Sequence, residues 1–117
     1  IERFPGQIHP FFVKEEQLDR TRIKESVRQA IAKIEEYLEL RKFDLIILDE
    51  ILNAHAEHFC NVKDLARLIR KAGSQELVMT GRRAPASIIR KSDYVSIIKK
   101  CKHPYDRKQA ARKGIEY

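Results

Sequence analysis

The chain has 117 residues, of which 43% are hydrophobic and 35% are charged, and its formal net charge is +7. A chain of this length forms one domain with a single hydrophobic core. It contains no apolar run of the roughly 20 residues that cross a bilayer, and two cysteines are too few for a disulfide scaffold. These features exclude a membrane-spanning or disulfide-rich protein and predict a cytoplasmic one.

The first predicted elements are a short strand at residues 1–4 and an aromatic loop at 7–14, followed by a long helix. The helix is expected to begin at about Asp19 or Thr21 and to end at Leu40, because apolar residues recur along it at spacings of three and four. Its apolar face is predicted to consist of Ile23, Val27, Ala30, Ile31, Ile34 and Leu38.

Residues 43–50, FDLIILDE, combine an apolar run with two carboxylates. The uninterrupted run predicts a strand that is covered on both faces, as in a parallel sheet. The strand ends in Asp49 and Glu50, which is the Walker B pattern, and rigidly held carboxylates of this kind bind Mg²⁺ together with phosphate and water. On the pattern alone, the alternative is a buried strand whose terminal acid only caps the next turn.

Two helices and two strands are expected after this point. A second helix is predicted between Asn61 as its N-cap and Gly73 as its stop signal. Residues 76–81 predict another buried strand, residues 84–92 a short helix, and residues 94–100 a last strand. This alternation predicts an α/β fold with a mainly parallel sheet and flanking helices. The buried side of the second helix is predicted to contain Leu65, Leu68 and Ile69.

The predicted topology places charged residues together. In open α/β sheets, ligands bind outside the carboxyl ends of the strands. Asp49-Glu50, Thr80-Gly81-Arg82 and the residues after Lys100 are all expected at that edge. Residues 82–113 also carry eleven Lys or Arg against two acids, a net charge of +9, so the last third of the chain is expected to attract an anion. No P-loop of the form GxxxxGK[ST] accompanies the Walker B pattern in the 117 residues.

Residues 55–60, HAEHFC, offer four side chains that could bind a metal, but a zinc site needs four ligands or three and a water. We therefore interpret them as a surface helix followed by a turn. Cys101 is interpreted as structural, since nothing in its surroundings marks an activated thiol. The four side chains considered are those of His55, Glu57, His58 and Cys60.

Several short segments carry a family resemblance. FDLIILDE, VMTGRRAP, SDYV, KHPYD and the terminal KGIEY occur in the order and spacing of the ATP:corrinoid adenosyltransferases, also called cob(I)alamin adenosyltransferases. The loop FFVKEEQ is also similar to that family, and the resemblance covers essentially all residues of the single domain 1–117. Members have a P-loop ahead of this point. The chain therefore resembles the C-terminal two thirds of a P-loop NTPase domain of the RecA-like type, without its N-terminal P-loop portion.

The resemblance implies a transferase of cobalamin biosynthesis. Members transfer the 5′-deoxyadenosyl group of ATP to the cobalt of a reduced corrinoid, which gives adenosylcobalamin and triphosphate. The implied cofactors are ATP, Mg²⁺ or Mn²⁺, and the corrinoid, and the resemblance allows an electron-donating flavoprotein and a homodimer as partners. Because the chain starts at Ile1 without Met and lacks the phosphate cradle, it is expected to be a piece of a longer protein and to be inactive alone.

By matching position, the resemblance implies roles for individual residues. Glu50 is the implied ligand of Mg²⁺, with Asp49 orienting the ion or a water. Arg82, after Thr80-Gly81, is expected to face the nucleotide or the corrinoid edge. The full set of implied cofactor-binding residues is Thr80, Arg82, Lys102, His103, Phe11 and Phe12.

Phe11 and Phe12 match the aromatic loop that in relatives packs beneath the corrinoid and keeps the lower axial base away. The alternative is that two adjacent phenylalanines fasten the loop to the core. The chain departs from the family pattern at Leu52-Asn53, at Ile97-Ile98 and near Lys108, which marks it as a divergent member.

The alternative function is a non-catalytic basic module that binds nucleotide or nucleic acid through residues 82–113. Such a module predicts binding that weakens steeply with salt. The segment lacks the interleaved aromatic residues of a stacking platform, which disfavours nucleic acid. A different P-loop enzyme that shares only the Walker B pattern is disfavoured by TGRRAP and KHP. The aromatic residues near the basic segment are Tyr94, Tyr105 and Tyr117.

Overall fold

The computed structural model describes residues 19–110, 112 and 114. The predicted strand at 1–4 and the loop at 7–14 lie outside the described residues. The rest forms a small α/β fold, as predicted, and none of its described helices has both the length and the apolar character to cross a bilayer. The elements in chain order are α1 (Arg20–Glu39), β1 (Leu45–Leu48), α2 (Ile51–Ala56), α3 (Val62–Ala72), β2 (Glu76–Met79), α4 (Ala86–Ile89) and the 3₁₀ helix η3 (Pro104–Arg107).

Helix α1 has the bounds that the apolar spacing predicted. The side chain of Asp19 accepts a hydrogen bond from the backbone N–H of Arg22 at 3.0 Å and so caps the first turn. Ile31 and Leu38 are buried on the inner face, and Val27 is partly buried beside them. The 3.6-residue period therefore identified the face of α1 that packs on the rest of the fold.

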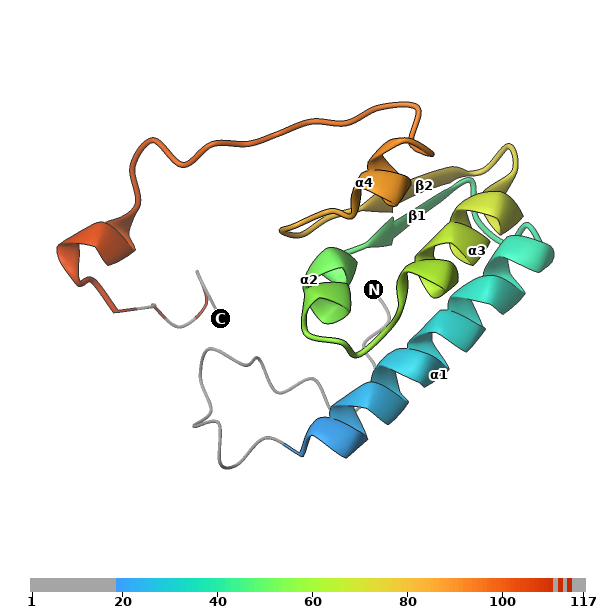
Figure 1. Cartoon of the computed structure of the whole chain (residues 1–117), viewed down its shortest axis with the longest axis horizontal. Coiled ribbons are helices and arrows are strands. Elements are labelled where there is room, and N and C mark those ends of the chain that lie inside the picture. The colour runs from blue at the N-terminus through green and yellow to red at the C-terminus, as the bar shows by residue number, and fades with distance from the viewer. Residues whose placement is uncertain (1–18, 111, 113, 115–117) are drawn as a thin grey trace.

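Helix α3 confirms the predicted start and stop signals. Asn61 and Asp64 form a capping box, in which each side chain accepts the other's backbone N–H at 3.0 Å. Leu65 and Leu68 are completely buried, and the helix ends at Gly73 with a φ of 58°. Figure 1 shows α1 and α3 side by side beneath the two strands, so these two helices form the layer that covers one face of the sheet.

Strands β1 and β2 pair in parallel, with Leu45 opposite Glu76 and Leu48 opposite Met79. The buried side chains of β1 are Ile46 and Leu48, which belong to the core cluster together with residues of α1 and α3. The prediction that this strand is covered on both faces is wrong for the described residues, since Leu45 is 51% exposed and Ile47 is 58% exposed. An uninterrupted apolar run allows both faces of a strand to be buried. Burial of a face also requires another element that packs on it, and no described element packs on the face of Leu45 and Ile47.

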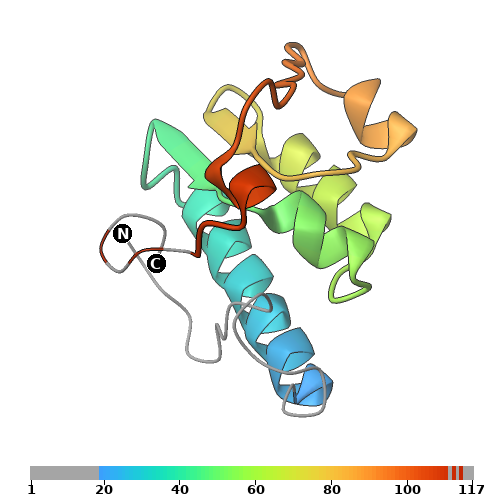
Figure 2. The ribbon, with the colours of Figure 1, turned by 90° about the vertical axis from the view of Figure 1, so that its left-hand side faces the viewer.

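The predicted strand at residues 94–100 is absent from the described structure, and this prediction was wrong. Tyr94, Ile97 and Ile98 are more than four-fifths exposed. Figure 1 shows this segment running away from α4 to η3, which stands apart from α2. In Figure 2, which is turned by 90°, η3 lies in front of α1 and the strands. A β-prone run becomes a strand only when a neighbouring strand pairs with it, and β1 and β2 pair with each other instead.

A charged cluster joins α1 to α3 at the edge of the core. Glu35 on α1 accepts hydrogen bonds from Arg67 at 2.6 Å and from Lys71 at 2.8 Å, both on α3. Its side chain is only 19% exposed. The hydrogen bond from the Lys71 ammonium group lowers the pKa of the Glu35 carboxyl below its ordinary value of 4.5. Partial burial opposes this shift, and Arg67 adds to it.

Glu35→Gln is expected to lower the free energy of unfolding by about 1 kcal/mol at neutral pH, since it removes a partly buried charged partner from two cations. A lowered pKa in the folded state stabilises the protein above pH 4.5, and this contribution is lost as the pH falls through the folded pKa. Chemical unfolding at a series of pH values should therefore show the difference between wild type and variant shrinking in acid.

Glu36→Gln is the matched control, because Glu36 pairs with Lys33 within α1 at an exposed position and, among the described residues, forms no ion pair with α3. It should change stability less than Glu35→Gln. Equal effects of the two substitutions, or a Glu35 effect that does not depend on pH, would show that the link between the helices contributes nothing.

Candidate functional site

The hydroxyl of Thr80 forms hydrogen bonds that link the carboxyl ends of the two strands. Thr80 follows β2 directly, and its hydroxyl donates to Oδ1 of Asp49 at 2.7 Å and accepts from the backbone N–H of Glu50 at 2.8 Å. The Thr80 backbone continues the ladder, since its N–H donates to Leu48 and its carbonyl accepts from Leu52. The parallel register thus places the acid pair of β1 beside the turn after β2, as the strand-end rule predicted.

The turn after Thr80 packs closely on the first turn of α2. A Cβ atom on Gly81 would lie 2.9 Å from the Cβ of Leu52 and 3.0 Å from the backbone nitrogen of Asn53. The backbone N–H of Arg82 donates to Oδ1 of Asn53 at 2.7 Å. Gly81 itself has a φ of 133°, a conformation that side chains with a Cβ rarely adopt.

Two further residues at this edge have a left-handed backbone although they are not glycines. Glu50, the N-cap residue of α2, has a φ of 56°, and Arg83 has a φ of 58°. Each such residue costs of the order of 1 kcal/mol, so it persists only where its surroundings fix it. The hydrogen bonds of Thr80 and Asn53 fix these turns.

The structure brings together four of the residues selected from the sequence: Asp49, Glu50, Thr80 and Arg82 are all at the carboxyl edge of the sheet. Lys102 and His103 are exposed and belong to the segment that runs away from α4 in Figure 1. The expected convergence of a third strand end is therefore wrong within the described residues, because the strand that would deliver it does not form. Phe11 and Phe12 lie outside the described residues.

Sequence reasoning did not assign a role to Asn53, although it recognised Leu52-Asn53 as a departure from the family pattern. The contact of Asn53 with Arg82 joins residues on two different elements. No local pattern in the sequence encodes it. A polar residue in the first turn of a helix that directly follows an acid-tipped strand is the one signal that could have indicated it.

The donor set at this edge fits a magnesium ion that is shared with a nucleotide. Mg²⁺ prefers one or two carboxylates and completes its coordination with phosphate and water. Asp49 and Glu50 are the two acids at this edge, and Oδ2 of Asp49 has no hydrogen-bond partner among the described residues. Within the same residues, no group of three or more His, Cys, Asp or Glu side chains is arranged to hold a metal. The edge therefore suits a metal with a phosphate ligand better than a closed all-protein site.

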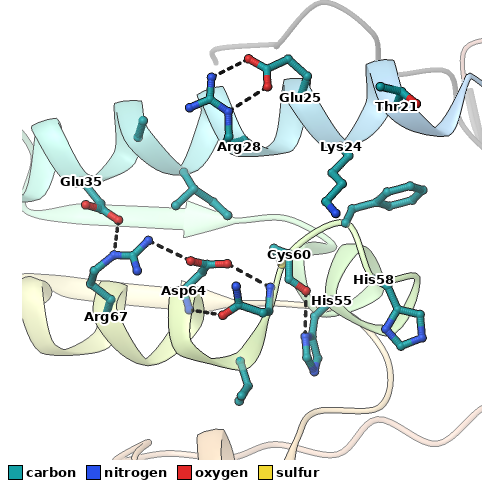
Figure 3. Close-up of a pocket in the computed structure, with 15 residues that line it drawn as sticks. Thr21, Lys24, Glu25, Arg28, Glu35, His55, His58, Cys60, Asp64 and Arg67 are labelled. Atoms are coloured by element: carbon teal, nitrogen blue, oxygen red, sulfur yellow. Dashed lines mark hydrogen bonds and ion pairs between the residues drawn. The ribbon is translucent and has the colours of Figure 1, made fainter.

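An open pocket of about 870 Å³ lies elsewhere, between α1 and the turn that joins α2 to α3. Figure 3 shows two groups of its charged side chains directed toward one another. Arg28 pairs with Glu25, and Arg67 pairs with Glu35 and Asp64. The acids that line the pocket thus neutralise most of its cations, and none of the residues selected as a catalytic or cofactor site lines it.

Residues 55–60 were predicted as a surface helix followed by a turn, and the structure has the last two residues of α2 and then the turn. Nδ1 of His55 lies 3.2 Å from the carbonyl oxygen of Cys60, a contact that closes the turn. Burial, assisted by the nearby carboxylate of Asp64, raises the pKa of the Cys60 thiol to about 11, so this thiol is protonated at neutral pH. Both Cys60 and Cys101 are free thiols.

The fold and this edge define the class: an α/β protein that presents an acid pair and an arginine-bearing turn at the carboxyl ends of parallel strands. The chain belongs to the family of ATP:corrinoid adenosyltransferases BtuR/CobO/CobP, which it matches over residues 3–117. This confirms the resemblance that the short segments indicated.

A corrinoid adenosyltransferase from a Sinorhizobium species is 27% identical to the chain over 124 aligned residues. The alignment covers 100% of this chain and 58% of that relative, so the chain spans less than two thirds of the relative's length. No solved structure matches the chain.

Proposed function

We propose that the whole protein transfers the 5′-deoxyadenosyl group of ATP to the cobalt of a reduced corrinoid. Cobalt(I) donates an electron pair to the 5′ carbon of ATP, the bond between that carbon and the triphosphate oxygen breaks, and triphosphate leaves as cobalt becomes cobalt(III). Membership of the family supports a corrinoid adenosyltransferase. The proposal adds this particular reaction, a P-loop type of fold and a cytoplasmic location.

The observation that carries the proposal is the meeting of Asp49 with Thr80 at the end of the parallel strands. Triphosphate leaves with several negative charges, so the reaction needs cations that are already in place near the leaving group. Bound magnesium would supply charge neutralisation there, with Glu50 as its ligand and Asp49 holding it or a water. Arg82 is exposed on the adjacent turn, where its guanidinium can reach a bound phosphate.

The proposal requires a phosphate-binding loop from elsewhere in the whole protein, since the 117 residues contain no GxxxxGK[ST] sequence. We also propose that Phe11, Phe12, Lys102 and His103 contact the nucleotide or the corrinoid in the complete site. We further propose that a flavoprotein supplies the electrons that reduce the corrinoid cobalt and that the whole protein forms a homodimer.

Adenosyl transfer by the whole protein is expected when ATP, Mg²⁺ and chemically reduced cobalamin are supplied together under anaerobic conditions. The measurement is formation of adenosylcobalamin with release of one triphosphate for each product. The isolated 117-residue chain is the comparison and is expected to form none, because it lacks the phosphate-binding loop. A whole protein that binds Mg·ATP but forms no adenosylcobalamin would overturn the proposed reaction.

A further inference from the structure

Asn53 contacts both strand ends on which the proposed function depends. Its backbone N–H donates to the carbonyl oxygen of Glu50 at 2.9 Å. Its side-chain Oδ1 accepts from the backbone N–H of Arg82 at 2.7 Å. A single residue of α2 is thus bonded to the residue proposed as metal ligand and to the residue proposed to face the nucleotide. We call this pair of hydrogen bonds the Asn53 bridge.

The turn that carries Arg82 depends on contacts from outside itself. Arg82 lies between Gly81, with a φ of 133°, and Arg83, with a φ of 58°. A left-handed conformation is unfavourable for a residue that has a Cβ atom, so the turn is not held by local preference. Gly81 packs against Leu52 and Asn53, and the bond to Asn53 fixes the direction of the Arg82 amide.

The other side-chain link at this edge does not replace the bridge. The hydroxyl of Thr80 contacts Asp49 and the backbone of Glu50. It therefore fixes the acid pair, but within the described part of the chain it forms no hydrogen bond with Arg82. The side chain of Asn53 accepts the hydrogen bond that holds the turn with Arg82 in place beside α2.

We propose that Asn53 is a positioning residue of the site, which holds the Arg82 turn in register with Glu50 so that the guanidinium is directed at the triphosphate of ATP. The inference rests on the proposed function and acts through Arg82, since Asn53 itself need not touch a substrate. A cation that is fixed before the substrate binds loses little freedom on binding, so the bridge should strengthen the binding of Mg·ATP.

The test uses three variants of the whole protein. Asn53→Leu keeps the size of the side chain but removes the acceptor, and Asn53→Asp keeps an acceptor oxygen at the same position. Asn61→Leu is the matched control, because Oδ1 of Asn61 also accepts a backbone N–H, from Asp64 at 3.0 Å, at the start of α3. It removes the same kind of hydrogen bond outside the candidate site.

Amide hydrogen exchange tests the bridge directly and requires no activity. The Arg82 amide is expected to exchange slowly in wild type, Asn53→Asp and Asn61→Leu, and at least about tenfold faster in Asn53→Leu. Equal exchange in wild type and Asn53→Leu would overturn the inference, whatever the protein catalyses.

Calorimetric titration with Mg·ATP tests the consequence. Asn53→Leu is expected to raise the Kd about tenfold, and to raise the KM for ATP similarly with the KM for the corrinoid nearly unchanged. Asn61→Leu should leave both within about twofold of wild type. Asn53→Asp is confined to the exchange measurement, because its added charge would itself repel triphosphate.

The outcomes separate the inference from the proposed function. Weaker Mg·ATP binding in Asn53→Leu alone supports the inference. Equal weakening in Asn53→Leu and Asn61→Leu would mean that Asn53 only stabilises the fold, and it would overturn the inference. A wild-type protein that binds no Mg·ATP would overturn the proposed function, and exchange at Arg82 would still decide whether the bridge exists.

Discussion

Glu50→Gln in the whole protein is expected to lower adenosyl transfer by about 100-fold or more, because it removes the carboxylate proposed to bind Mg²⁺ at the triphosphate. Glutamine keeps the length of the side chain and one oxygen, but not the negative charge that attracts the ion. The backbone N–H of residue 50 still donates to the Thr80 hydroxyl, so the turn should form as in wild type. The loss should therefore come from the metal and not from misfolding.

The dependence of the rate on Mg²⁺ distinguishes a metal ligand from a residue with another role. The Mg²⁺ concentration that gives half of the maximal rate should rise about tenfold or more in Glu50→Gln. Glu57→Gln is the control, since Glu57 is an exposed acid at the far end of α2. Its Oε2 atom lies 4.0 Å from Nη1 of Arg20. It should change neither the rate nor the requirement for Mg²⁺. A Glu50→Gln protein with the wild-type Mg²⁺ requirement would rule out Glu50 as the ligand.

Helices α1 and α3 were predictable because the signals that define them are local. Asp19 and Asn61 each cap the helix that begins at the next residue, and Gly73 ends α3 with a positive φ of 58°, which favours glycine. These interactions join residues within one or two turns, so a single sequence contains all of the information they need. The period of the apolar residues then predicted which faces of α1 and α3 are buried.

Strands β1 and β2 were located correctly, but their surroundings were not. Ile46 and Ile47 are adjacent and equally apolar, yet Ile46 is buried and Ile47 is 58% exposed. Nothing in the run LIIL distinguishes the two faces, because the difference comes from the elements that pack on each side. The segment 94–100 failed as a strand for a related reason, since pairing needs a partner and β propensity does not specify one.

The site was predictable where a topological rule applied. Strand ends of a parallel sheet meet at one edge, and this rule alone predicted that Asp49 and Thr80 lie together. It could not give the contact between Asn53 and Arg82, which depends on the start of α2 and on the conformation of Gly81. The rule for strand ends thus predicted which residues meet at the candidate site, while the hydrogen bonds that orient them required the structure.

Gly81→Ala is expected to lower the free energy of unfolding by about 3 kcal/mol, the sum of backbone strain and overpacking. The added Cβ would lie 2.9 Å from the Cβ of Leu52 and 3.0 Å from the backbone nitrogen of Asn53, and neither atom belongs to a flexible side-chain end. The φ of 133° adds a conformational penalty that no movement of the neighbours removes. Chemical denaturation of the whole protein measures the loss.

Gly73→Ala separates the two contributions. Gly73 also has a positive φ, 58°, but the nearest atom to a Cβ there is the carbonyl oxygen of Lys71 at 4.0 Å. This variant should therefore lose about 1–2 kcal/mol, the conformational part alone. Gly81→Ala should in addition weaken Mg·ATP binding, because the turn must move away from Asn53 to make room and takes Arg82 with it. Equal losses of stability at the two glycines, with Mg·ATP binding unchanged, would show that the arginine turn tolerates displacement and that its close approach to α2 does not constrain the site.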